Sequence, residues 1–165
     1  MVDDASGRAA PRGGDLSPLG LRLRQHRFGV PSEAVATWEN VKRIALGLPE
    51  TEERISRSGR QWRVGEKLFV WERPLRKGEL AELGPAAPRG AILGARVEDT
   101  AAKAALLASD PDVFFTTSHF DGYPAVLIRL KAIPAAELRE IVVEAWLARA
   151  PKRLAAQYVA EHFPK

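Results

Sequence analysis

The segment from Val113 to Leu130, VFFTTSHFDGYPAVLIRL, constrains the fold more than any other stretch of the chain. Two runs of β-forming residues flank the pair Asp121-Gly122. This pair favours a two-residue type I′ turn, in which both turn residues need positive φ. The sequence therefore predicts an antiparallel hairpin over residues 113–130. Its register places one set of residues on the core face: Val113, Phe115, Val126, Ile128 and Leu130.

The rest of the chain alternates between helical and β-type patterns. Thr37 is a candidate N-cap for a helix that begins at Trp38 and ends near Gly47 and Pro49. β-type runs are expected at 53–57, 60–64, 67–72 and 91–97, and helices at 77–83, at 100–108 and after Pro134, with Pro151 interrupting the last. This order predicts an α+β fold with a single antiparallel sheet of about five to six strands and helices packed on one face.

Length and composition set the broad class. A chain of 165 residues, 45% of them hydrophobic, is expected to form one domain. Residues 1–35 are rich in Gly, Pro and Arg and are interpreted as a disordered leader, which leaves 36–162 as the domain. The chain has no cysteine and no apolar run of membrane-spanning length. A monomeric, cytoplasmic protein that does not bind membranes is the default expectation.

Basic residues are concentrated in the first predicted hairpins. Turns at Ser58-Gly59 and Gly65-Glu66 would place Arg57 opposite Arg60 and Arg54 opposite Arg63, and such like-charge pairs would be relieved by phosphate. The expected core face carries Ile55, Trp62, Val64, Phe69 and Trp71. The candidate nucleic-acid-binding residues are Arg54, Arg57, Arg60, Arg63, Lys67, Arg73, Arg76 and Lys77. An ordinary solvated sheet face, with arginine stems covering apolar area, is the other interpretation of the same charges.

The predicted 113–130 hairpin supplies a second candidate site. Its face opposite the core carries Phe120, Tyr123 and Arg129, and His119 continues the core-side face toward the turn. The candidate ligand-binding residues are His119, Phe120, Tyr123 and Arg129. Ser118, His119 and Asp121 resemble a nucleophile, a base and an acid, but adjacent strand residues point to opposite faces. We therefore expect no catalytic residues, although His119 is the one candidate general base. The spacing of the histidines predicts no metal site, and no nucleotide-binding loop or other cofactor motif is present.

Four segments together resemble the MmcQ/YjbR family. They are ATWENVKRIALGLPETEE at 36–53, WRVGEKLFVWERPL at 62–75, FFTTSHFDGYPAVLIRL at 114–130 and AWLARAPKRL at 145–154. The resemblance covers about residues 36–160 and implies a compact α+β fold like that of CyaY, the bacterial frataxin. Chains of this bacterial family often begin near Ala36, so residues 1–35 lie outside the resemblance.

The resemblance also implies a partner. Members are commonly labelled DNA-binding proteins, from a supposed wing-like use of the sheet hairpins, and the family supplies no catalytic residues. Iron chemistry, suggested by the frataxin-like fold, is not expected, because the first helix lacks a dense acidic ridge. The leading hypothesis is therefore a non-enzymatic protein that binds the DNA backbone weakly and largely without sequence preference. The alternative is a small-ligand or protein-interaction module around Phe120, Tyr123 and Arg129.

Overall fold

The computed structural model describes residues 35–165, and the predicted leader over residues 1–34 lies outside this range. The strands are β1 Thr51–Ser56, β2 Gly59–Val64, β3 Lys67–Glu72, β4 Ile92–Arg96, β5 Phe114–Phe115 and β6 Ala125–Arg129. The α-helices are α2 Trp38–Leu46, α3 Lys77–Leu83, α4 Thr100–Ser109, α5 Ala135–Arg149 and α6 Lys152–His162. Short 3₁₀ turns are η2 Gly84–Ala86, η3 Ser118–Phe120 and η4 Leu130–Ala132. None of the described helices is both long and apolar enough to cross a membrane.

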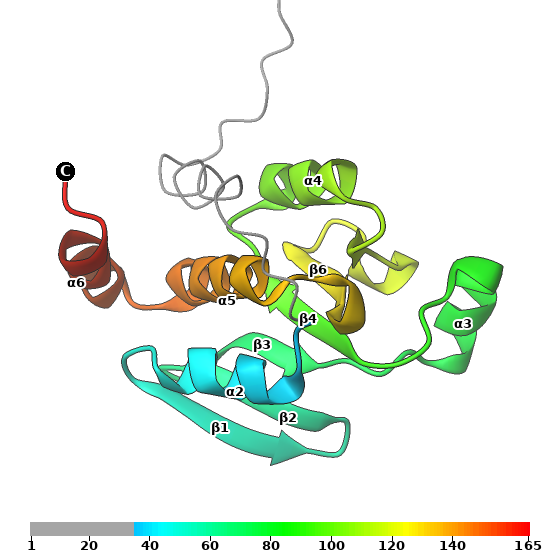
Figure 1. Ribbon diagram of the computed structural model, residues 1–165, viewed down its shortest axis with the longest axis horizontal. Helices are drawn as coiled ribbons and strands as arrows, with labels where there is room; N and C mark the ends of the chain where they lie inside the picture. The colour runs from blue at the N-terminus through cyan, green and yellow to red at the C-terminus, as the bar shows by residue number, and fades with distance from the viewer. Residues whose placement is uncertain (1–34) are drawn as a thin grey trace, which may run out of the picture.

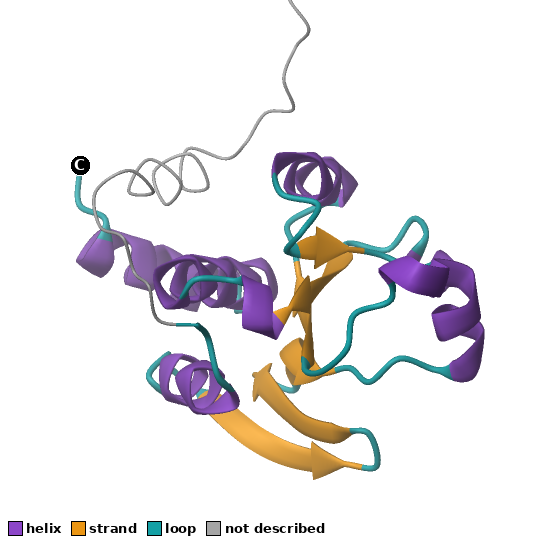
Figure 2. Ribbon diagram, turned by 45° about the vertical axis from the view of Figure 1, so that its right-hand side comes forward, coloured by secondary structure: helices purple, strands orange, loops and turns teal. Residues whose placement is uncertain are grey.

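The six strands form one antiparallel sheet in the order β1-β2-β3-β4-β6-β5 (Figure 1). This confirms the predicted α+β class and its single sheet. Figure 2 shows α2 and α5 on one side of the sheet and α3 on the other. Val35 forms a bridge with Pro134, and the Ala36 N–H donates to the Ile133 carbonyl at 3.3 Å. The first described residues are therefore held beside the segment that leads into α5.

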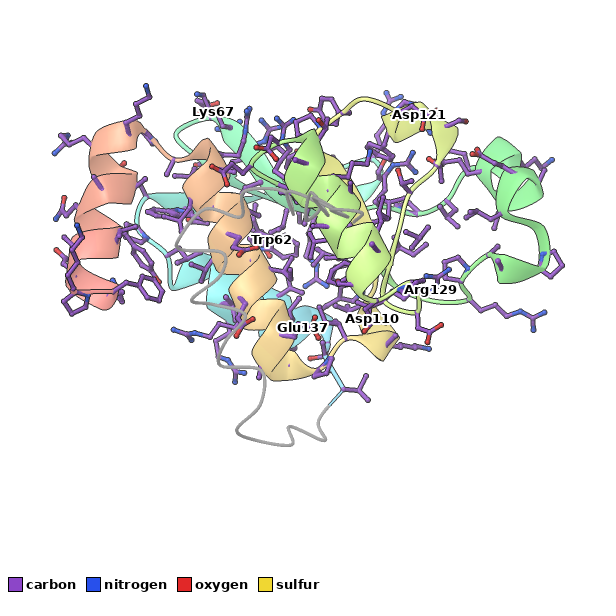
Figure 3. All side chains as sticks on the ribbon, turned by 90° about the horizontal axis from the view of Figure 1, so that it is seen from above. Trp62, Lys67, Asp110, Asp121, Arg129 and Glu137 are labelled. Atoms are coloured by element: carbon purple, nitrogen blue, oxygen red, sulfur yellow. The ribbon has the colours of Figure 1, made fainter. Side chains whose placement is uncertain are left out.

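The main core lies between the sheet and the helices α2 and α5. Trp62 of β2 and Trp146 of α5 are fully buried there, and Trp62 lies beneath α5 in Figure 3. The start of α2 is fixed as predicted, because Thr37 and Asn40 cap each other through paired backbone and side-chain hydrogen bonds. Removal of this large apolar surface from water is the dominant stabilising term of the fold.

A second, smaller core lies on the opposite face of the sheet. It contains six buried residues: Trp71, Ile92, Phe115, Phe120, Ala125 and Leu127. Strand alternation explains this division, because Leu93 and Ala95 of β4 face the main core whereas Ile92 faces the second one. The second core covers only part of its face, which leaves room beside it for a surface cleft.

The predicted register of the first hairpin is wrong: the turn begins one residue earlier, so each β1 residue pairs with a β2 residue two positions before the predicted one. The turn is Arg57-Ser58, so Ile55 pairs with Arg60 and Ser56 pairs with Gly59. Ile55 shares the face of Arg60, but it is 84% exposed. The predicted burial of Ile55 is therefore wrong.

A β-bulge alters the next hairpin. The turn at Gly65-Glu66 is confirmed, since Val64 pairs with Lys67, but the register shifts between Trp62 and Arg63. Both Phe69 and Val70 consequently face the main core, and Trp71 turns to the second core. The expectation that Trp71 shares the face of Trp62 is therefore wrong.

The 113–130 segment is antiparallel as predicted, but it is not a two-residue hairpin. Phe114 pairs with Ile128 and Phe115 with Leu127, which places Phe115 in the second core instead of the main one. Asp121 has φ −58° and Gly122 has φ +72°, so only the glycine needs positive φ. The turn is therefore of type II, closed by a 3.0 Å hydrogen bond from the Tyr123 N–H to the Phe120 carbonyl.

Candidate functional site

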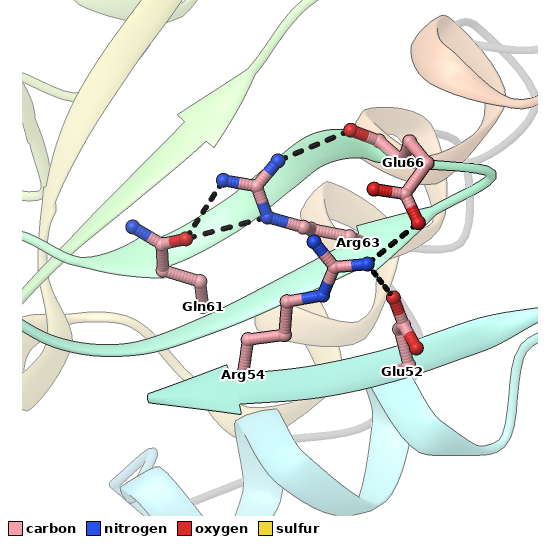
Figure 4. Close-up of polar contacts among 5 residues, drawn as sticks. All are labelled: Glu52, Arg54, Gln61, Arg63 and Glu66. Atoms are coloured by element: carbon pink, nitrogen blue, oxygen red, sulfur yellow. Dashed lines mark hydrogen bonds and ion pairs between the residues drawn. The ribbon is translucent and has the colours of Figure 1, made fainter. Parts of the chain in front are cut away.

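Arg54 and Arg63 lie together on the sheet face away from α2, as predicted, but they do not oppose each other. Arg54 faces Gln61, and Arg63 faces Glu52. The Arg54 guanidinium forms ion pairs with Glu52 and, at 2.6 Å, with Glu66 (Figure 4). The hydrogen bond with Arg54 lowers the pKa of Glu66. The expected like-charge pair is therefore absent, and acidic neighbours already neutralise Arg54.

Arg60 does not oppose Arg57 either. It lies on the helix-covered face, where its guanidinium forms an ion pair with Glu72 and lies 5.8 Å from the ring centroids of Trp38 and Trp62. The distance to both rings fits a cation–π contact inside the fold. On the adjacent strand, Trp71 pairs with Gln61 and not with Arg60.

Arg73 is buried. Its Nη1 lies 2.9 Å from Glu79 Oε1 of α3, and its Cζ lies 5.2 Å from the Phe120 ring centroid. The Thr117 hydroxyl donates to Glu79 Oε2 at 2.7 Å. Burial on its own raises the pKa of Glu79, but hydrogen bonds from the Arg76 N–H, Thr117 and Arg73 more than offset it, so the pKa lies below its ordinary value. Arg73 thus forms a buried ion pair that stabilises the fold, and its prediction as a surface phosphate contact is wrong.

The other predicted basic residues are exposed but scattered. Arg57 lies in the β1–β2 turn and Lys67 begins β3 after the β2–β3 turn, so the two occupy opposite ends of β2. Arg76 and Lys77 lie at the start of α3. The eight predicted basic residues therefore do not converge on one surface.

Three of the four predicted ligand-binding residues lie together. His119, Phe120 and Tyr123 line a surface cleft, whereas Arg129 does not. Arg129 donates to the Pro111 carbonyl at 3.1 Å and to the Ala86 carbonyl at 3.2 Å, and it covers the Phe115 ring. Figure 3 shows Arg129 near Asp110 and well away from Asp121. Arg129 thus links the loops that carry Pro111 and Ala86, and its prediction as a ligand-binding residue is wrong.

The cleft has a volume of about 620 Å³ and runs along the sheet face that carries the second core. Leu68 and Trp71 of β3 contribute its apolar side, and the β-bulge is what turns Trp71 toward it. A Cβ on Gly94 of β4 would lie 2.3 Å from the Trp71 ring, so the glycine makes room for the indole. The polar and charged lining residues are Ser58, Gln61, Glu72, Arg73, Arg76, Arg96, His119, Asp121, Tyr123 and Arg149.

A buried lysine holds the wall formed by the 118–123 segment. Lys103 of α4 donates from Nζ to the Phe120 carbonyl at 2.5 Å and to the Tyr123 carbonyl at 3.0 Å. Burial lowers the pKa of Lys103, and the nearby Asp121 carboxylate partly offsets this. The lysine thus anchors both ends of the type II turn that carries Asp121.

Two further arginines line the cleft, and neither is among the residues that the sequence predicts for the site. Arg96 at the end of β4 donates to the Tyr123 hydroxyl, with its Cζ 4.5 Å from the ring centroid, and Arg149 lies in the last turn of α5. Burial lowers the pKa of Arg96; Tyr123 offsets this, and the like charge of Arg149 lowers it further. Strand alternation through Ile92 and Gly94 puts Arg96 on the same face as Trp71, but no local sequence signal connects it to Arg149.

The Ser118, His119 and Asp121 side chains do not assemble into a triad. The Ser118 hydroxyl lies 2.9 Å from Glu82 Oε2, and the His119 ring lies edge-on to Phe120 at 4.9 Å. The physical reason differs from the predicted one, because Ser118 and His119 belong to a 3₁₀ turn and not to a strand. Within residues 35–165, no group of three or more His, Asp or Glu residues could hold a metal ion.

The chain is similar to proteins of one family in sequence and in fold. A family model described as YjbR matches residues 46–148. Uncharacterised proteins of Mycobacterium tuberculosis and Mycobacterium bovis are 50% identical over 129 residues, which cover 76% of this chain and 98% of each relative. The crystal structure of a Deinococcus radiodurans protein with a DUF419 domain has a TM-score of 0.51 and 14% identity over 78% of this chain and 81% of that one. At that identity the likeness concerns the fold alone.

Proposed function

The chain belongs to the YjbR family, and we propose that it is a non-enzymatic module that binds a small molecule in the cleft beside β3. The observation that carries the proposal is the cleft itself. Its volume of about 620 Å³ falls within the range of small-molecule sites, roughly 300–1,000 Å³. An apolar side at Leu68 and Trp71 faces convergent polar groups, and this is the usual composition of a ligand pocket.

The walls of the cleft are held in place, which favours a site formed before the ligand arrives. Lys103 fixes the turn that carries Asp121, and the Arg73–Glu79 pair fixes the segment between β3 and α3. A rigid site loses less conformational entropy when it binds, so more of the contact energy appears as affinity. Tyr123 is 46% exposed and lies at the rim, where it is accessible to a ligand.

An NMR fragment screen on the full chain tests this proposal. We expect small aromatic fragments to shift the resonances of Trp71, Leu68 and Tyr123. Leu68→Trp would fill the cleft and abolish these shifts, whereas Ile55→Trp adds the same bulk at a residue that is 84% exposed and outside the cleft. Fragments that bind elsewhere, or equal binding to both variants, would refute the proposal.

DNA binding is the second candidate function. The observation that favours it is that, within residues 35–165, no carboxylate forms an ion pair with Arg57, Arg63 or Lys67. Arg63 donates only to neutral oxygens, namely Gln61 Oε1 and the Glu66 carbonyl (Figure 4). These cations remain able to contact phosphate, although Arg54, Arg60 and Arg73 already have acidic partners.

Titration of a labelled DNA duplex at two salt concentrations tests the second candidate. We expect the double variant Arg57→Gln/Lys67→Gln to weaken binding and to flatten its salt dependence, because each lost phosphate contact lowers the slope by about one. The double variant Lys152→Gln/Arg153→Gln removes the same charge from exposed positions of α6. Equal losses in the two variants would assign the binding to net charge and exclude the hairpins as a DNA site.

A further inference from the structure

Arg96 and Arg149 line the same cleft from different elements, and neither forms an ion pair with a carboxylate of residues 35–165. Arg96 lies at the end of β4 and Arg149 at the end of α5. The Nε atom of each is buried and donates to no acceptor. A buried donor without an acceptor loses its hydration and gains nothing in return, so each of these two atoms raises the free energy of the ligand-free fold.

The charges of the two guanidiniums are also uncompensated. Among residues 35–165, no carboxylate forms an ion pair with either of them. The two acidic residues of the lining do not fill this role, because Glu72 pairs with Arg60 and Asp121 is exposed in its turn. Arg149 is close enough to Arg96 to oppose its charge. The arrangement thus places two like charges beside a partly desolvated cleft.

We propose that Arg96 and Arg149 together bind a dianionic group of a small molecule, either a phosphate monoester or a dicarboxylate. This inference rests on the proposed function and names the ligand class of the same cleft. Two guanidinium forks suit an oxyanion, because each offers several N–H donors in one plane, and two negative charges match two positive ones.

The neighbouring groups define the rest of the ligand. Tyr123 accepts a hydrogen bond from Arg96, so its hydroxyl proton stays available to donate to a ligand oxygen. Leu68 and Trp71 lie along the same cleft and offer an apolar surface for the uncharged part of the molecule. We therefore expect a dianion with a short planar or apolar body to bind more tightly than inorganic phosphate.

Calorimetric titration of the full chain with phenyl phosphate, inorganic phosphate, succinate and phenol tests the inference. At least one dianion should bind saturably, and phosphate against succinate distinguishes the two ligand sources. Arg96→Gln and Arg149→Gln should each weaken binding about tenfold or more, because each removes a charge-assisted contact. Arg153→Gln, an exposed arginine of α6 outside the cleft, should change it less than about twofold.

Two further measurements keep the result interpretable. Arg96→Lys and Arg149→Lys retain the charge but lose the planar fork. Each should therefore bind the dianion more weakly than wild type and have a similar melting temperature.

Equal losses of dianion affinity in Arg153→Gln and in the cleft variants would overturn the inference. If neutral fragments bind in the cleft but no dianion does, the inference fails and the proposed function stands. If nothing binds there, both fail.

Discussion

Arg54 and Arg60 of the first hairpins differ from Arg96 and Arg149 of the cleft in their acidic neighbours. Arg54 and Arg60 carry ion pairs with Glu66 and Glu72, whereas no described carboxylate pairs with Arg96 or Arg149. The hairpins have the higher density of basic residues, but much of that charge is neutralised within the sheet. The positions of carboxylates such as Glu66 and Glu72 therefore indicate where an anion can bind better than the number of arginines does.

The largest expected effect concerns the buried ion pair between Arg73 and Glu79, which links the end of β3 to α3. Glu79→Gln leaves the Arg73 charge without its carboxylate in a site where both side chains are less than one-tenth exposed. Breaking a buried ion pair from one side costs about 3 kcal/mol or more. We therefore expect a loss of that size in the free energy of unfolding, measured by urea denaturation. Glu52→Gln, the same change at an exposed partner of Arg54, serves as the control and should cost far less.

A loss in Glu79→Gln no larger than in Glu52→Gln would contradict the burial of the Arg73–Glu79 pair. It would mean that water reaches Arg73 as readily as Arg54, and the wall of the cleft would then be no more rigid than the exposed hairpin. The proposal of a preformed site would lose its main structural support.

A smaller effect is expected for Gly94→Ala. The added Cβ would lie 2.3 Å from the Trp71 ring, which cannot move without disturbing the second core. Overpacking of this kind costs about 1–3 kcal/mol. Gly78→Ala in α3 is the control, since nothing lies within 4 Å of its Cβ and alanine favours helices. Thermal unfolding should show a lower melting temperature for Gly94→Ala and an unchanged or higher one for Gly78→Ala.

The parts of the fold that the sequence predicts correctly are those that depend on residues close together in the chain. The Thr37 cap, the turn at Gly65-Glu66 and the bounds of β3 depend on neighbouring residues, and all three are confirmed. The bulge between Trp62 and Arg63 places the Trp71 ring against Gly94 of another strand. No local pattern contains that information, and a single-residue shift moves a side chain to the other face.

The candidate site divides in the same way. His119, Phe120 and Tyr123 were predicted together because one short turn carries them. Arg96 and Arg149 were missed because β4 and α5 bring them together only in the folded chain. A count of basic residues along the sequence favoured the hairpins, since acidic partners such as Glu79 lie outside the 54–77 segment or across a strand.

The pH dependence of stability tests the electrostatic role of Glu79. Its pKa in the folded chain lies below the ordinary value of 4.5, so the folded state binds the proton more weakly than the unfolded state. This contribution is therefore complete above about pH 4.5 and is lost as pH falls through the folded pKa. We expect the difference in free energy of unfolding between wild type and Glu79→Gln to shrink from pH 7 to pH 3. A constant difference would contradict the assignment.

The smallest expected effect concerns the exposed Arg54–Glu66 pair. The hydrogen bond from Arg54 lowers the pKa of Glu66, so Arg54→Gln should raise that pKa toward its ordinary value. A carbon-detected NMR titration of the Glu66 carboxyl measures the change. Salt near 1 M should produce a similar rise in wild type, because the screening length falls to about 3 Å. If neither the substitution nor the salt changes the pKa of Glu66, then Glu66 does not neutralise Arg54. Arg54 would in that case be available to bind phosphate.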